Sequence, residues 1–173
     1  MAVDQRRLDW DDRHKDGDFE GRGPNPTLVA GAAGLRPGRA LEHACGSGTN
    51  AVWLAGQGWQ TTAVDWSPVG LANGREKAEA SGVEVDWLER DLFAWSPPEQ
   101  AFDLVVMVYL HLLPEERGPV YARAAAAVAP GALNAASSYL TDFQTSSSKG
   151  NPKPQSGPLP CVMRLVPVPV SKS

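Results

Sequence analysis

The sequence predicts an α/β protein with a Rossmann-like, doubly wound and mostly parallel sheet. Segments with strand character and segments with helix character alternate four times along the chain. This alternation is the pattern of a parallel sheet that carries helices on both sides. Residues 102–109 form a near-continuous apolar run, which is typical of a central parallel strand buried on both faces.

Local signals mark the ends of the predicted elements. Gly58 and Gly82 stand where a left-handed residue commonly ends a helix. Ser67 and Pro68 form a helix cap with proline at the first helical position. The predicted strands are 39–43, 59–65, 83–88 and 102–109, and the predicted helices are 27–34, 50–57, 68–80 and 114–129, after a first helical segment within 4–23.

Length and composition restrict the functional classes. The 173 residues are enough for one domain with a core, and the formal charge of −4 gives no general attraction for nucleic acid. The two cysteines lie far apart, and no metal-ligand spacing is present, so neither a disulfide framework nor a metal site is indicated. Without a signal peptide or an apolar run that could span a bilayer, we expect a cytoplasmic protein with no membrane partner.

A glycine-rich turn follows the first predicted strand. Gly46 and Gly48 allow a sharp bend and a close approach of a ligand to the backbone. Together with Ala51 and with Asp65 further along, they satisfy the G-x-G-x-x-A fingerprint of dinucleotide-binding proteins. By itself this fingerprint leaves a dinucleotide and S-adenosylmethionine as alternative cofactors.

Acidic residues near this turn favour S-adenosylmethionine. Glu42 ends the first strand, where a carboxylate would repel a pyrophosphate and attract the ammonium group of a methionine moiety. No lysine or arginine lies between Glu42 and Asp65, which predicts a pocket without basic side chains. Asp65 can accept both ribose hydroxyls, and Asp91 with the backbone of Leu92 is placed to bind adenine after the third strand.

Four motifs together resemble a class I S-adenosylmethionine-dependent methyltransferase. They are the runs 41–50, 63–68, 90–92 and 102–106. The resemblance covers about residues 10–131 and is greatest to small bacterial enzymes of the tellurite-resistance and thiopurine methyltransferase-like type. It implies a small-molecule substrate and these cofactor-binding residues: Glu42, Ala44, Gly46 and Gly48 for methionine, Asp65 and Trp66 for the nucleoside, Asp91 and Leu92 for adenine, and Trp10 with Arg13 as a closing element. Ala44 stands where many members of the family have glycine.

Two residues after the fourth strand are the candidate catalytic residues. Tyr109 and His111 lie where the substrate nucleophile should meet the methyl group. Methyl transfer by in-line displacement depends mainly on orientation, and His111 is the candidate base where the nucleophile carries a proton. His14, in contrast, is expected at the surface.

The chain changes character after Gly131. Residues 132–173 hold eight serines and six prolines, with one acid against four bases. The resemblance predicts a fifth strand, a helix and an antiparallel strand pair here, and residues 132–139 do not show that pattern. We therefore expect a methyltransferase domain over 1–131 and an atypical Ser/Pro-rich tail over 132–173, either disordered or translated in a shifted reading frame. A homodimer would cover the sheet edge exposed by the missing elements.

Three functions therefore stay open from the sequence. The first is an active small-molecule methyltransferase. The second is a cofactor-binding remnant whose activity is impaired by the altered C-terminus. The third is a nicotinamide-dependent oxidoreductase that uses the same glycine turn.

Overall fold

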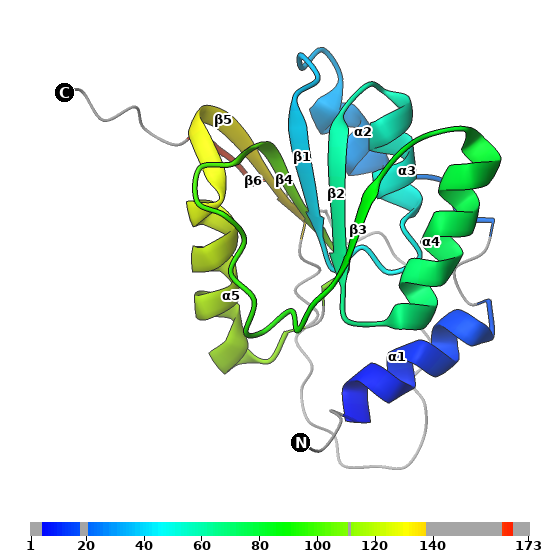
Figure 1. The fold of residues 1–173 in the computed structure, drawn as a ribbon. Helices are drawn as coiled ribbons and strands as arrows, with labels where there is room; N and C mark the ends of the chain where they lie inside the picture. Colours follow the sequence, from blue (N-terminus) through cyan, green and yellow to red (C-terminus); the bar gives the residue numbers. More distant parts are fainter. Residues whose placement is uncertain (1–4, 18–20, 111, 138–163, 168–173) are drawn as a thin grey trace.

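The structure, a computed structural model, describes residues 5–17, 21–110, 112–137 and 164–167. Figure 1 shows one sheet with helices on both sides. In chain order the elements are α1 (Gln5–Lys15), α2 (Pro26–Ala32), β1 (Arg39–His43), α3 (Thr49–Gly56), β2 (Gln60–Asp65), α4 (Pro68–Ser81), β3 (Asp86–Glu89), β4 (Phe102–Val108), α5 (Pro114–Ala126), β5 (Val128–Ser137) and β6 (Arg164–Pro167).

The described strands form a six-stranded sheet in the order β3-β2-β1-β4-β5-β6. The first five strands in this order pair in parallel, and β6 pairs antiparallel with β5. Strand order reverses between β1 and β4, because β2 follows β1 on one side while β4 returns to its other side. In such sheets, ligands bind at the carboxyl ends of the strands beside this switch point. The predicted fold class is confirmed.

The two faces of the sheet bury different sets of residues. On β4, Val105 and Met107 pack in a cluster with Val120 and Ala124 of α5. The alternate β4 residues Leu104, Val106 and Val108 join Leu28 and Leu54, which come from α2 and α3. Figure 1 shows α5 on one side of the sheet and α2, α3 and α4 on the other. The apolar run of β4 therefore has helices on both faces, as its sequence predicts.

Most predicted elements agree with the structure to within a few residues. β1 has the predicted bounds, and α4 follows the Ser67 cap, whose hydroxyl accepts the Gly70 N–H at 3.0 Å. The third strand is shorter than predicted and covers only Asp86–Glu89. These small shifts occur at element ends, where local signals are weakest.

A fifth strand follows α5, although residues 132–139 do not show the strand pattern that the resemblance predicts. β5 covers Val128–Ser137 and continues across the predicted domain boundary at residue 131. It pairs with β4 in parallel, with Leu104 opposite Leu133 and Val108 opposite Ser137. β6 adds a short strand at the sheet edge, the position that its proline-containing sequence allows. The rest of the predicted Ser/Pro-rich tail lies outside the described residues.

Candidate functional site

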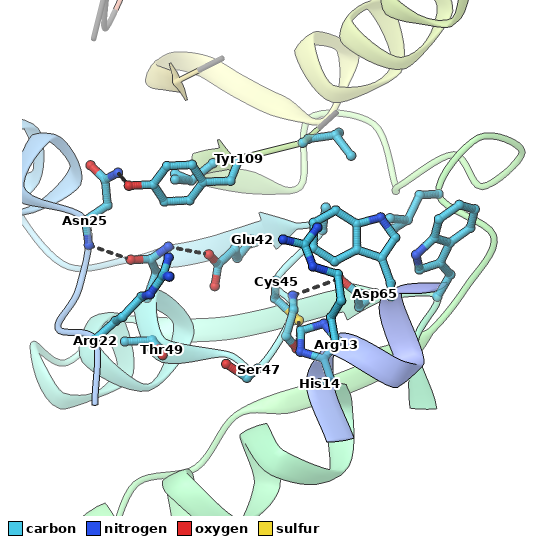
Figure 2. Close-up of a pocket in the computed structure, with 18 of the residues that line it drawn as sticks. Arg13, His14, Arg22, Asn25, Glu42, Cys45, Ser47, Thr49, Asp65 and Tyr109 are labelled. Atoms are coloured by element: carbon cyan, nitrogen blue, oxygen red, sulfur yellow. Dashed lines mark hydrogen bonds between the residues drawn. The ribbon is translucent and has the colours of Figure 1, made fainter. Parts of the chain in front are cut away.

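A pocket of about 400 Å³ lies at the carboxyl ends of β1, β2 and β4. This volume is within the range of small-molecule and cofactor sites in proteins. Figure 2 shows side chains from several elements converging on it. The glycine turn after β1 forms its floor, and the N-terminal segment supplies residues from α1 and from 22–26 to its walls. The sheet thus places the predicted site at its topological switch point.

The glycine turn has the backbone conformation that its sequence requires. Ala44, Gly46 and Gly48 have φ angles of 64°, 53° and 68°, in the left-handed region that glycine adopts most easily. Ala44 therefore occupies a position that favours glycine, the residue that the resemblance predicts there. Gly48 is the N-cap of α3, and Thr49 and Asn50 in the first turn of that helix line the pocket.

Glu42 is the most buried charged side chain of the pocket. It is 1% exposed, and its Oε1 accepts a hydrogen bond from Asn50 Nδ2 at 2.8 Å. Its Oε2 is buried and has no hydrogen-bond partner among the described residues. Burial raises the pKa of Glu42 to about 8, against the opposing hydrogen bonds from Asn50 and the Ala51 backbone. A buried carboxylate oxygen of this kind is suited to a cationic donor.

Asp65 connects the glycine turn to the start of α4. Its Oδ2 accepts the Gly46 N–H at 2.8 Å, and its Oδ1 accepts the Ser67 N–H at 2.9 Å. Burial raises the pKa of Asp65, and the same backbone N–H groups oppose that shift. Asp65 lines the pocket, and each carboxylate oxygen can accept more than one hydrogen bond. The two backbone hydrogen bonds give Asp65 a structural role. Ribose binding by Asp65 stays a prediction.

Asp91 and Leu92 differ in their relation to the pocket. Leu92 is buried and lines it, and its contact with adenine stays a prediction. Asp91 is exposed, lies outside the pocket lining, and its Oδ1 accepts the backbone N–H groups of Phe93 and Ala94. Asp91 therefore stabilises the turn after β3, and its contact with adenine stays a prediction.

Aromatic side chains and one arginine form the wall beside Leu92. The Trp66 and Phe93 rings meet edge to face with centroids 5.1 Å apart. The Arg6 guanidinium lies 4.6 Å from the Phe93 centroid and also pairs with Glu116 of α5 at 2.9 Å. A flat aromatic base fits such a wall, because stacking and cation–π contacts both act on a π-face. Trp66 thus lies where the sequence predicts a cofactor-binding residue.

The N-terminal helix brings positive charge to the pocket. Arg6 and Arg13 of α1 and Arg22 after it all line the cavity, together with Trp10. The expectation of a pocket without basic side chains is therefore wrong. The sequence between Glu42 and Asp65 indeed has no base, but tertiary packing supplies arginines from a distant segment.

Docking of α1 explains this arrangement. The Ser67 hydroxyl donates a buried hydrogen bond of 2.5 Å to Asp11, whose other oxygen accepts from Arg7 at 2.8 Å. His14 is 6% exposed and packs against the glycine turn, so the surface position expected for it is wrong. Trp10 and Arg13, the predicted closing element, line the pocket. The Arg13 guanidinium carbon lies 4.7 Å from the centroid of the Trp10 ring.

Of the two candidate catalytic residues, only Tyr109 can be placed. It lines the pocket after β4, is 50% exposed, and has a φ of 59°. Its hydroxyl oxygen lies 3.2 Å from Asn25 Nδ2. A non-glycine residue with this backbone conformation is often found at functional sites. His111 lies outside the described residues.

Acid destabilisation is expected from His43, the neighbour of Glu42 on β1. His43 is 2% exposed and stacks on Trp95, and burial, helped by Arg123, lowers its pKa to about 4. The His43 imidazole therefore takes up a proton near pH 6.5 in the unfolded chain, but only near pH 4 in the folded chain. The contribution of His43 to the free energy of unfolding should fall over this interval by on the order of 2–3 kcal/mol, while the raised pKa of Glu42 acts in the opposite direction. Urea unfolding of the wild type and of a variant without this imidazole, at pH 6.5, 5 and 4, measures the loss as a difference.

The variant His43→Phe tests the assignment. It keeps an aromatic ring against Trp95 and removes the titrating group, so its stability should decrease less than that of the wild type between pH 6.5 and 4. Parallel curves for the two proteins would contradict the prediction.

The comparisons with known proteins agree with this geometry. Residues 40–131 match the family model of the methyltransferase domain. The chain belongs to the class I S-adenosylmethionine-dependent methyltransferases. The family match covers the glycine turn, both acidic strand ends and β4. S-adenosylmethionine is the cofactor of this family.

Individual relatives are similar in sequence or in fold. A demethylmenaquinone methyltransferase of Thermus thermophilus is 40% identical over 75 residues, which are 42% of this chain and 34% of that protein. The didemethyltoxoflavin N1-methyltransferase of Burkholderia thailandensis is 22% identical, with a TM-score of 0.66 over 83% of this chain and 67% of that chain. A TehB-like methyltransferase of Corynebacterium glutamicum is 19% identical, with a TM-score of 0.59 over 78% and 73%. The two structural likenesses show the fold alone.

The chain spans about a fifth to a third of the length of the curated relatives that it matches. Among the described helices, none is long and apolar enough to cross a membrane. The described residues also contain no group of three histidine, cysteine, aspartate or glutamate side chains that could hold a metal ion.

The pocket fits the methyl-donor cofactor of the family. The buried Glu42 Oε2 requires a hydrogen-bond donor, and the cofactor's ammonium group is such a donor. Asp65 and the Trp66–Phe93 wall line the same cavity as Glu42.

Proposed function

We propose that this protein transfers a methyl group from S-adenosylmethionine to a small-molecule nucleophile by in-line displacement. The observation that supports this most directly is the Glu42 Oε2 atom, which is buried and has no hydrogen-bond partner among the described residues. A pyrophosphate brings no cation to this buried carboxyl group, whereas an ammonium group would favour its ionised form and complete its hydrogen bonds. The oxidoreductase alternative is therefore disfavoured.

The protein's contribution to the reaction is mainly orientation. The cofactor supplies an activated methyl group on a sulfonium. Glu42 holds the methionine end and Asp65 the ribose, while Trp66 and Phe93 confine the adenine. The acceptor then occupies the part of the pocket between β4 and residues 22–26, where Tyr109 contributes a hydroxyl. Holding the nucleophile at contact distance from the methyl group supplies most of the rate.

His111 keeps its proposed role as a base for nucleophiles that carry a proton. Its place in the sequence, two residues after Tyr109, supports this role. A His111→Ala variant should then lose about 10²–10⁴-fold in rate on such an acceptor. Unchanged turnover would contradict the role.

The primary test is binding of S-adenosylhomocysteine, the product of the reaction. A ligand present at 100 times its Kd stabilises the folded state by about 2.7 kcal/mol, so the melting temperature should rise by several degrees. NAD at the same concentration is the control and should give no shift. The absence of a shift with S-adenosylhomocysteine would contradict the proposed function, and a shift with NAD alone would favour an oxidoreductase.

Binding should also release a proton near neutral pH. With a pKa of about 8, Glu42 is largely protonated at pH 7 in the ligand-free protein. The cofactor's ammonium group favours the ionised carboxylate and lowers that pKa. Affinity should consequently rise between pH 6 and 8. Isothermal titration calorimetry in phosphate and Tris, whose ionisation enthalpies differ, measures the proton count directly, and equal heats would contradict the prediction.

Activity and assembly require separate measurements. The alternative of an impaired remnant predicts S-adenosylhomocysteine binding without turnover on thiols, amines, hydroxyls, selenite or tellurite. We also propose a homodimer, formed where the outer strands β3 and β6 end the sheet. Unpaired strand edges favour such association. A monomeric mass in light scattering at micromolar concentration would exclude this dimer.

A further inference from the structure

We propose that the methyl acceptor carries a carboxylate or similar oxyanion, which Arg22 and the Tyr109 hydroxyl bind beside β4. This proposal rests on the proposed function and specifies its substrate class. Its basis is the orientation of one buried amide, Asn25, and the guanidinium of Arg22, a residue that lines the same pocket. Figure 2 shows Arg22, Asn25 and Tyr109 at the same end of the pocket.

The orientation of the Asn25 amide follows from its backbone partners. Asn25 is 5% exposed and caps α2, where its Oδ1 accepts the N–H groups of Thr27 at 2.9 Å and Leu28 at 3.2 Å. Only the oxygen of an amide can accept these hydrogen bonds. The NH₂ group must therefore be the end that lies 3.2 Å from the Tyr109 hydroxyl.

This orientation determines the role of the Tyr109 hydroxyl. An amide NH₂ group only donates, so the Tyr109 oxygen accepts from Asn25 and its own hydrogen points elsewhere. Tyr109 lines the pocket and is half exposed, so this hydrogen can reach an acceptor bound there. Asn25 is thus a positioning residue that makes Tyr109 a hydrogen-bond donor toward the pocket.

Arg22 adds a second donor at the same end. Its side chain is exposed at the pocket rim, three residues before Asn25. A guanidinium has no acceptor atom and binds carboxylates and other oxyanions with two parallel hydrogen bonds. Apolar side chains of Val108, Leu110 and Pro24 also line the cavity. An acceptor with an apolar body and an anionic group satisfies both sets of residues.

The test uses benzoate and benzamide, which share their shape and differ in charge. Each is titrated into protein saturated with S-adenosylhomocysteine, and binding is followed by calorimetry. Benzoate should bind about 10-fold or more tightly than benzamide, as expected for a charge-assisted contact. Equal affinities would overturn the proposal while the S-adenosylhomocysteine titration still supports the proposed function. Failure of S-adenosylhomocysteine to bind would overturn both.

Two variants locate the contact. Arg22→Gln should remove the preference for benzoate and leave the Kd of S-adenosylhomocysteine unchanged within about 3-fold. If it weakens S-adenosylhomocysteine as strongly as benzoate, then Arg22 binds the cofactor's carboxylate and the proposal is wrong. Tyr109→Phe should weaken both probes, because both offer an oxygen to the hydroxyl. Unchanged affinity in either variant would overturn its assigned contact.

Asn25→Asp separates positioning from folding. The substituted carboxylate keeps an oxygen for the α2 cap but replaces the NH₂ group by an acceptor. The Tyr109 hydroxyl should then donate to that carboxylate, so the affinity for uncharged benzamide should fall as in Tyr109→Phe. If the role of Asn25 were purely structural, a variant with an unchanged melting temperature would bind benzamide as tightly as the wild type. That result would overturn the inference. Arg39→Gln, which removes a surface pair with Asp103 away from the pocket, is the matched control and should alter neither probe.

Discussion

Replacing Glu42 with glutamine is expected to weaken S-adenosylhomocysteine binding by about 100-fold or more. Removing one partner of a buried, hydrogen-bonded charge pair typically costs about 2–5 kcal/mol, which corresponds to this range. The Glu42 carboxylate is 1% exposed and its Oε2 has no partner among the described residues. The amide of glutamine can still accept from Asn50, but it brings no negative charge to the ammonium group.

The same variant should fold at least as well as the wild type at alkaline pH. Because burial raises the pKa of Glu42 to about 8, the folded chain keeps a proton that the unfolded chain loses above about pH 4.5. The stability that Glu42 contributes to the wild type is therefore lost as the pH rises from about 4.5 to 8. Glutamine has no such proton, so the stability of the variant relative to the wild type should increase over this interval.

Two measurements separate binding from folding. Calorimetry with S-adenosylhomocysteine gives the loss of affinity, and urea unfolding at pH 5 and pH 8 gives the change in stability. Glu89→Gln, at an exposed position on β3, is the matched control and should change the affinity by less than about 2-fold. An unchanged Kd in Glu42→Gln would show that the carboxylate does not hold the cofactor.

The sequence predicts the glycine turn and the two acidic strand ends well, because their signals are local. The turn with Gly46 and Gly48 requires left-handed backbone angles, and only a few residue types adopt them easily. Glu42 and Asp65 end neighbouring parallel strands, so the sheet brings them to the same edge.

The features that the sequence misses depend on contacts between distant segments. β5 has an alanine- and serine-containing sequence with little strand preference of its own, and its pairing with β4 determines its conformation. Arg6 and Arg22 precede Glu42 by 36 and 20 residues. They reach the pocket because the N-terminal segment that contains them is held there by the packing of α1 on α4. That packing includes the Ser67–Asp11 hydrogen bond. No local pattern predicts such a contact.

One missed residue did have a usable signal. Asn25 followed by Pro26 is a favourable helix start, with a capping side chain and proline at the first helical position. If Asn25 and Pro26 are interpreted only as a chain break, they predict nothing about the pocket. If Asn25 is interpreted as a helix cap, the cap determines which way its amide points. The contact with Tyr109 is visible only in the folded structure.

Substituting Gly48 with alanine is expected to destabilise the protein by about 3 kcal/mol or more. Gly48 has a φ of 68°, where an L-residue costs roughly 1–2 kcal/mol. An added Cβ would also lie 2.6 Å from Cζ3 of Trp87 and still closer to Cη2. Trp87 packs against the cluster of Ala51, Ala63 and Leu71. Moving its ring therefore disturbs a well-packed region, which typically costs a further 1–3 kcal/mol.

Gly82 provides a matched control for the backbone contribution. It has a nearly identical φ of 65°, and an added Cβ there meets no atom within 4 Å. Gly82→Ala should therefore cost only the backbone strain, about 1–2 kcal/mol, and the difference between the two variants measures the clash with Trp87. Urea unfolding of both variants gives this difference. Combining Gly48→Ala with Trp87→Leu should cost less than the sum of the two single changes, because the leucine leaves room for the Cβ. Strict additivity, or equal losses in Gly48→Ala and Gly82→Ala, would show that the indole does not restrict position 48. The requirement for glycine would then be a property of the turn alone.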